Sequence, residues 1–210
     1  MRDQTMPIDL DRRAKPQQKR AEERIESILD ATEAMLRRMA VDDITTSAVA
    51  KEAGIPVGTV YRYFPNIYAV YSAIFARFNQ DAIAVLLEEE AGRVGRWQDE
   101  LAADLNGVTR LFEDQPAYRA VYLLTLTTRE LASVRETWNM QLAEHLARGW
   151  AAGDDGFSGE DASVIARMVI EIFTAAQMQI LRNWDDKAKC EAIAKERMTA
   201  LEGYLQNYLH

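Results

Sequence analysis

Apolar residues recur at helical spacing along most of this chain. Between residues 17 and 40 they fall three or four positions apart, and the charged side chains lie mostly outside that stripe. Similar patterns follow downstream, interrupted by glycines, prolines and the turn sequence GDDGFSG. The pattern predicts an all-α protein whose longer helices span about 17–40, 67–90, 97–112, 117–124, 129–152, 160–183 and 186–208.

Two shorter helices are predicted within residues 44–64. Thr45 is a suitable N-cap for a helix over about 46–53, and Gly54 can adopt the left-handed conformation that ends a helix. After this turn, a second helix is expected over about 57–64. Helices this short are unstable in isolation, so both are expected to pack against the longer helix that precedes them. The predicted arrangement is a three-helix helix-turn-helix unit.

The second short helix is expected to have a buried face and an exposed face. Val60 and Phe64 are expected to point inward. A helix-turn-helix unit reads DNA when this helix lies in the major groove, where Thr59 and Arg62 could reach base edges. Gly58 would permit a close approach of the backbone to DNA. Periodicity alone leaves two interpretations about equally open, DNA binding and the ordinary packing of a helical hairpin.

The complete string of residues favours the first interpretation. From Thr45 to Phe64 the sequence reads T-T-x-x-V-A-x-x-A-G-I-P-x-G-T-V-Y-R-Y-F, which closely resembles the DNA-binding motif of TetR-family transcriptional regulators. The resemblance is close over these residues and looser over the preceding helix. It implies a dimeric, all-helical repressor whose amino-terminal domain binds double-stranded operator DNA. The larger carboxy-terminal domain would dimerise and accept a small-molecule effector.

The residues expected to face DNA come from both short helices. The hydroxyl groups of Thr45, Tyr61 and Tyr63 are expected to bind phosphates. The complete predicted set is Thr45, Thr46, Ser47, Pro56, Val57, Gly58, Thr59, Tyr61, Arg62 and Tyr63. The chain departs from the family at Ile67, where a phosphate-binding lysine is common. This departure leaves open a second interpretation, a TetR-fold ligand sensor or adaptor that no longer binds DNA.

The charge of the chain is unevenly distributed. A formal net charge of −8 at pH 7 opposes binding to a polyanion. Residues 1–65, however, carry 11 basic and 11 acidic side chains, so the whole excess of acid lies in residues 66–210. We expect the acidic part to orient the neutral part toward DNA. The predicted domains are a flexible basic arm over 1–15, a helix-turn-helix domain over 16–65, and an effector-binding and dimerisation domain over 66–210.

The last two predicted helices carry more apolar surface than one neighbouring helix can cover. This is clearest over 160–183, where the apolar face is wide. The surplus predicts a homodimer in which both helices meet the same pair of a second copy. The alternative is that both helices only cap their own domain.

Aromatic and polar residues in the carboxy-terminal part could line an effector cavity. Such cavities are mostly apolar and contain a few oriented polar groups. Gln177 lies amid the apolar face of its helix and is expected to form a hydrogen bond inside the protein. Each candidate alone is more commonly a core residue, but together they favour an aromatic or otherwise apolar effector. The predicted set is Trp97, Phe112, Tyr118, Tyr122, Thr125, Trp138, His145, Met168, Phe173 and Gln177.

Little in the sequence indicates catalysis or metal binding. His145 is the only histidine besides the terminal His210, and neither a Cys/His metal spacing nor a phosphate-binding glycine loop is present. The single cysteine, Cys190, suits a reducing compartment. The sequence suggests neither a signal peptide nor a membrane span. We therefore expect a cytoplasmic, non-enzymatic protein without a metal or cofactor.

Overall fold

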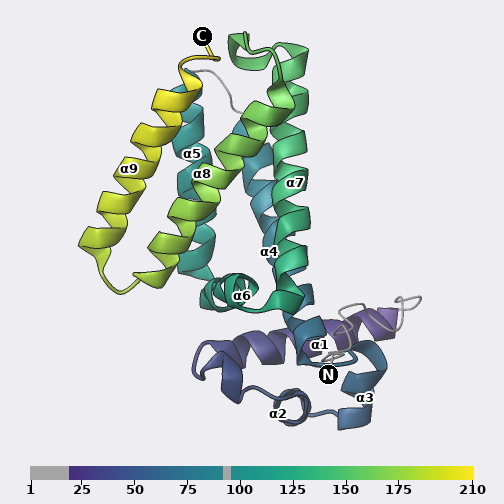
Figure 1. The fold of residues 1–210 in the computed structure, drawn as a ribbon. Coiled ribbons are helices and arrows are strands. Elements are labelled where there is room, and N and C mark those ends of the chain that lie inside the picture. The colour runs from purple at the N-terminus through teal and green to yellow at the C-terminus, as the bar shows by residue number, and fades with distance from the viewer. Residues whose placement is uncertain (1–18, 92–95) are drawn as a thin grey trace, which may run out of the picture. The chain divides into compact units, whose positions relative to one another are not determined.

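The computed structural model describes residues 19–91 and 96–210 of the chain (Figure 1). All regular structure within these ranges is helical, which confirms the predicted all-α class. The 3-10 helices are η1 (Val41–Asp43) and η2 (Asp154–Gly156). The α-helices are α1 (Lys19–Leu36), α2 (Thr46–Glu52), α3 (Val57–Tyr63), α4 (Ile67–Ala91), α5 (Trp97–Asp114), α6 (Pro116–Thr127), α7 (Arg129–Ala152), α8 (Ala162–Arg182) and α9 (Lys187–Leu205). The basic arm predicted over 1–15 lies outside the described residues.

The chain forms two compact units, each built from two separate stretches of sequence. Unit 1 comprises residues up to Asp81 together with Leu111–Ser133, and unit 2 comprises Ala82–Arg110 and Val134–His210. Helices α4, α5 and α7 therefore contribute residues to both units. Unit 1 contains the helix-turn-helix segment and also α6, so it is larger than the domain suggested over 16–65.

Several helices begin at a side chain that accepts a hydrogen bond from a backbone amide of the first turn. Such bonds satisfy amides that have no partner within the helix. These capping residues are Thr45 before α2, Asn66 before α4, Asp161 before α8 and Asp186 before α9. The predicted cap at Thr45 is confirmed, with 3.2 Å between its Oγ1 and the Ala48 nitrogen.

The core of unit 1 joins α1 to the two short helices. Ile28, Val49, Val60 and Phe64 are completely buried, so the inward direction predicted for Val60 and Phe64 is confirmed. Burying these side chains stabilises α2 and α3, which are too short to persist alone. The hydroxyl of Thr32, also buried, donates a hydrogen bond of 2.8 Å to the carbonyl of Ile28 within α1.

Unit 2 is built around the packing of α8 against α9. Leu201 and Leu205 of α9 are buried, as are Val169 and Ile170 of α8, and Trp150 of α7 belongs to the same apolar cluster. In Figure 1, α8 lies between α9 and α7. Their shared core fixes the side chains that surround the cavity described below.

Helix α8 has a length and an apolar content that would allow it to cross a membrane. In this structure, 44% of its most apolar window is buried, and the polar side chains of Thr174 and Gln177 are buried with it. Its hydropathy is explained by one face that packs in the core of unit 2 and a further apolar face that stays exposed at Val164 and Met168. These are the features of a core helix that has a second apolar surface.

Candidate nucleic-acid interface and ligand cavity

The turn between α2 and α3 has the geometry that its sequence predicts. Gly54 adopts a positive φ of 65°, which is readily accessible only to glycine. The amide of Ile55 donates a hydrogen bond of 3.0 Å to the carbonyl of Ala50, and the Ile55 side chain is buried. Pro56 then precedes the first turn of α3 as its N-cap residue. The turn therefore fixes the direction in which α3 leaves α2.

One face of α3 is exposed and combines apolar, hydroxyl and cationic groups. Val57 and Tyr61 are 40% and 44% exposed, and the side chain of Arg62 is also exposed. The guanidinium of Arg62 donates a hydrogen bond of 2.9 Å to the Tyr63 hydroxyl and lies 4.8 Å from the centre of the Tyr63 ring. Tyr63 thus holds Arg62 in place on the surface of the helix.

Two residues of the predicted DNA-facing set point into the protein instead. Tyr63 is 5% exposed, so its predicted outward orientation is wrong. It lies three residues after Val60 and therefore shares the buried face of α3. Thr46 is also buried, because it precedes the buried Val49 by three residues. The other predicted positions on α2 and α3 are exposed or partly exposed.

Gly58 has no packing role within the part of the chain that the structure describes. A Cβ atom built at this position meets no heavy atom within 4 Å. Glycine inside a helix costs about 1 kcal/mol relative to alanine. Since the interior of the protein does not require this glycine, its presence is consistent with a close partner outside the protein.

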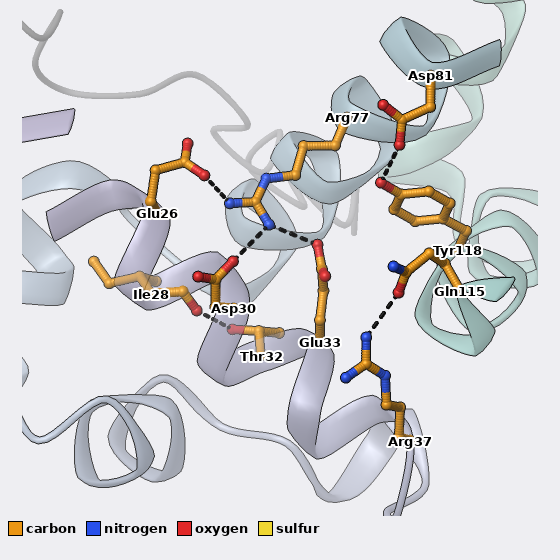
Figure 2. Close-up of polar contacts among 10 residues, drawn as sticks. All are labelled: Glu26, Ile28, Asp30, Thr32, Glu33, Arg37, Arg77, Asp81, Gln115 and Tyr118. Carbon is orange, nitrogen blue, oxygen red and sulfur yellow. Dashed lines mark hydrogen bonds and ion pairs between the residues drawn. The ribbon is translucent and has the colours of Figure 1, made fainter. Parts of the chain in front are cut away.

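A cationic side chain on α4 holds α1 in place within unit 1. The guanidinium of Arg77 contacts Glu26, Asp30 and Glu33, with distances of 3.0 Å to Asp30 and 2.7 Å to Glu33 (Figure 2). Burial acts to lower the pKa of Arg77, but the hydrogen bond and charge of Glu33 and the charge of Glu26 outweigh it, so the pKa is raised. The sequence signal for this site is an acidic stripe on α1 at four-residue and three-residue spacing.

Further polar contacts join α6 and η1 to the helices around the helix-turn-helix. The Tyr118 hydroxyl donates a hydrogen bond of 2.5 Å to Asp81, and Arg37 donates one of 2.7 Å to Gln115 (Figure 2). Burial and the hydrogen bond to Asp81 raise the pKa of Tyr118, so its hydroxyl stays protonated at neutral pH. On α4, Tyr71 donates a hydrogen bond of 3.0 Å to a backbone carbonyl of η1. These contacts hold α6 and η1 against α1 and α4 within unit 1.

Unit 1 also carries an open acidic groove of about 730 Å³ along α1 and α2. Its charged lining is dominated by carboxylates, which would repel the phosphates of DNA. The groove is therefore electrostatically unfavourable for a nucleic acid. The acidic side chains are Glu22, Glu23, Glu26, Asp30 and Glu52.

Unit 2 contains a small apolar cavity, called the inner cavity below. Its volume is about 90 Å³, and it lies among α4, α5, α7, α8 and α9. Aliphatic side chains and Phe173 form most of its wall, while Asp104 and His145 are its charged or titratable lining residues. An apolar wall with few polar groups suits the apolar part of a small molecule.

A larger open space, called the outer recess below, adjoins the inner cavity. Its volume is about 630 Å³, and it shares Leu101, Asp104, His145 and Leu146 with the inner cavity. Trp97 lines the outer recess but not the inner cavity. Asp104 and His145 thus contribute to the walls of both spaces.

The structure brings together only part of the predicted ligand-binding set. His145 and Phe173 line the inner cavity, and Trp97 lines the outer recess. Trp138 is buried without lining either space. Met168 is 44% exposed on α8, because its helix turns this side chain away from the core. Gln177 is completely buried, lines neither space, and accepts a hydrogen bond from Arg197.

Four other members of that set belong to the core of unit 1 and line neither space. Phe112, Tyr118 and Tyr122 pack around Phe78, with ring centres 4.9 to 5.9 Å from its own. Thr125 is buried and donates a hydrogen bond of 2.7 Å to the carbonyl of Tyr122. Helical spacing correctly predicted that these residues are buried. It did not predict that they belong to unit 1.

Comparison with known proteins identifies the family of this chain. A family model described as bacterial regulatory proteins, tetR family, matches residues 28–74, which include α2 and α3. A second, described as tetracyclin repressor-like, C-terminal domain, matches residues 97–205. The chain belongs to the TetR family. A comparison with curated proteins found no match.

Solved structures of TetR-family regulators share this fold. A TetR-family transcriptional regulator from Streptomyces coelicolor is 23% identical, with a TM-score of 0.61 over 89% of this chain and 99% of that chain. SmeT, the repressor of the Stenotrophomonas maltophilia multidrug efflux pump SmeDEF, is 21% identical, with a TM-score of 0.66 over 89% and 90%. FadR, a fatty acid degradation regulator from Bacillus halodurans, is 17% identical, with a TM-score of 0.61 over 90% and 97%. These relatives are described as regulators rather than enzymes, and at these identities the likeness establishes the fold alone.

Proposed function

We propose that this TetR-family protein is a transcriptional repressor that binds a palindromic DNA operator as a homodimer and is released by a small, largely apolar effector. The observation that carries the proposal is the exposed face of α3, where Thr59, Tyr61 and Arg62 surround a glycine with no internal packing role. Arg62 and Thr59 would read base edges, and Tyr61 would bind phosphate together with Thr45. The hydroxyl of Thr45 caps α2 as an acceptor, so its own hydrogen stays available for a phosphate.

The exposed apolar face of α8 supports the homodimer. Val164 and Met168 are 59% and 44% exposed on the same face, four residues apart. Pairing this face with the same face of a second copy would remove it from water. A two-fold dimer would place two copies of α3 in successive major grooves, roughly 34 to 36 Å apart or a multiple of it.

The two neighbouring spaces of unit 2 support a small apolar effector. The apolar wall of the inner cavity suits an aromatic or aliphatic group, and the outer recess has room for the remainder of the molecule. SmeT, a relative with the same fold, has been solved in complex with triclosan. Helix α4 contributes Leu86 to the inner cavity and Arg77 to the network on α1, so it links the effector site to the DNA-binding unit along the chain.

Selection from a random pool of duplex DNA tests the proposed function. We expect the purified protein to enrich a palindrome, and its affinity for that site to fall steeply as salt concentration rises, because bound phosphates release counterions. The measurement is the sequence of the enriched pool followed by binding titrations across a salt series. Absence of enrichment, with weak binding at every salt concentration, would contradict DNA reading and support the sensor or adaptor suggested by Ile67.

Replacing Gly58 with alanine should separate stability from DNA binding. We expect the free energy of unfolding to rise by about 0.5–1 kcal/mol, because alanine favours the helix and no side chain obstructs it. Affinity for the selected operator should fall at least about tenfold, because the added methyl group blocks close approach of α3 to DNA. Gly203 of α9 is likewise free of neighbours, so Gly203→Ala measures the gain in stability from the same substitution outside the helix-turn-helix. Unchanged DNA affinity in Gly58→Ala would contradict a close contact at this position.

A further inference from the structure

The packing of α8 on α9 contains an arginine whose surroundings do not neutralise it. Arg197 is 4% exposed, and its Nη1 donates a hydrogen bond of 2.7 Å to Oε1 of Gln177. Its guanidinium carbon lies 5.6 Å from the ring centre of Phe173. Burial lowers the pKa of Arg197 to about 10, and the side chain is still a cation at neutral pH. Within the described ranges, no carboxylate forms an ion pair with it.

Two buried hydrogen-bond donors at this site have no acceptor. Nε of Arg197 and Nε2 of Gln177 are both buried and without a partner among the residues that the structure describes. Because Oε1 of Gln177 already accepts from Arg197, the amide orientation leaves its NH₂ group as the unused donor. Buried donors without acceptors are rare in native proteins, since each loses its hydrogen bonds to water. A positive charge beside two unused donors calls for an anionic acceptor.

Neither residue lines the inner cavity, but helical spacing places each of them one turn beyond a residue that does. On α9, Arg197, Leu201, Leu205 and Leu209 follow one another at four-residue intervals, and all four are buried. Leu201 lines the inner cavity, whereas Leu205 and Leu209 line the outer recess. Arg197 therefore lies one turn beyond Leu201, on the side of the inner cavity that is away from the outer recess. On α8, Gln177 lies one turn beyond Phe173, which also lines the inner cavity.

We propose that Arg197 and Gln177 form an anion-binding end of the inner cavity, and that the effector is an amphipathic carboxylate whose apolar body lies along the cavity toward the outer recess. A carboxylate has enough lone pairs to accept from both unused donors and from the guanidinium. A leucine at position 197 would pack in the stripe without burying a charge, so packing alone does not account for arginine. The proposal rests on the proposed function only in calling this ligand the effector.

Calorimetric titration of the full chain tests the proposal without DNA. The probes are octanoate and 2-naphthoate, each compared with its neutral amide, octanamide or 2-naphthamide. We expect at least one carboxylate to bind about tenfold or more tightly than its amide, which corresponds to about 1.4 kcal/mol. Equal affinity of acid and amide for both pairs, or binding of neither acid, would overturn the proposal.

Variants then assign the preference to the buried arginine. Arg197→Met should remove the preference for the carboxylate, leave amide affinity unchanged, and retain or raise the melting temperature, because a buried unpaired charge is lost. Arg182→Met changes net charge equally at an exposed position of α8 and should keep the preference. Should Arg197→Met not fold, Arg197→Lys keeps the charge but lacks the forked donors, and a reduced preference is expected. A preference that survives these changes would place the anion elsewhere and overturn the assignment.

The outcome is independent of whether the protein reads DNA. A protein that enriches a palindrome but shows no preference for carboxylates would retain the proposed function and refute the anion site. A protein that binds the carboxylate through Arg197 but selects no DNA would support the anion site and contradict the repressor.

Discussion

Replacing Arg77 with methionine is expected to lower the free energy of unfolding by about 3 kcal/mol, the lower end of the range for breaking a buried ion pair. The guanidinium joins α4 to three carboxylates on α1, and Glu33 is 8% exposed. Removing the cation leaves Glu33 buried without it, and that desolvated carboxylate accounts for most of the cost. Glu26 and Asp30 are exposed and return to water, which limits the loss. Urea unfolding followed by circular dichroism measures the effect.

An exposed ion pair of the same unit provides the control. Arg38 contacts Glu52 at 2.6 Å, with side chains that are 52% and 34% exposed. Arg38→Met should change the free energy of unfolding by less than about 1 kcal/mol, because solvent screens exposed pairs. If both variants lose the same free energy of unfolding, burial does not determine how much the Arg77 network stabilises the protein.

Replacing Arg62 with alanine is expected to weaken binding to the selected operator and to relax base preference at one position of each half-site. A bidentate arginine contact to a base discriminates by about 1–3 kcal/mol, and a dimer makes the contact twice, so the total loss is about 2–6 kcal/mol. Tyr63 holds the guanidinium on the surface of α3 before DNA binds, which reduces the entropy lost on binding. Repeating the selection with the variant and comparing affinities for both pools measures the two effects.

Tyr61→Phe is the matched comparison for Arg62. Removing the Tyr61 hydroxyl leaves the size and exposure of the side chain nearly unchanged, and we expect affinity for all DNA sequences to fall by a similar factor because a phosphate contact is lost. The selected sequence itself should remain the same. If both variants weaken every sequence equally, Arg62 does not read bases.

Local features of this chain could be predicted from the sequence because they depend on neighbouring residues. The cap at Thr45, the left-handed Gly54 and the inward direction of Val60 follow from backbone chemistry and helical spacing. The family also follows from one continuous string over α2 and α3, and the matching family models confirm it. Within the same string, the predicted outward orientation of Tyr63 was wrong. Helical spacing alone allowed Tyr63 to lie either on the exposed face or on the buried face with Val60.

The composition of the sites was decided by tertiary structure. Aromatic residues predicted for the cavity divide between two compact units, since apolar periodicity shows that a side chain is buried but not which neighbours surround it. Arg77 and Arg197 read in the sequence as ordinary charged residues of long helices. The packing of α4 on α1 places Arg77 beside three carboxylates. The packing of α9 on α8 leaves Arg197 without a carboxylate partner among the described residues. The sequence by itself determined the helices, the turn and the family; the tertiary structure decided which charges are paired, because pairing depends on contacts between residues distant in the chain.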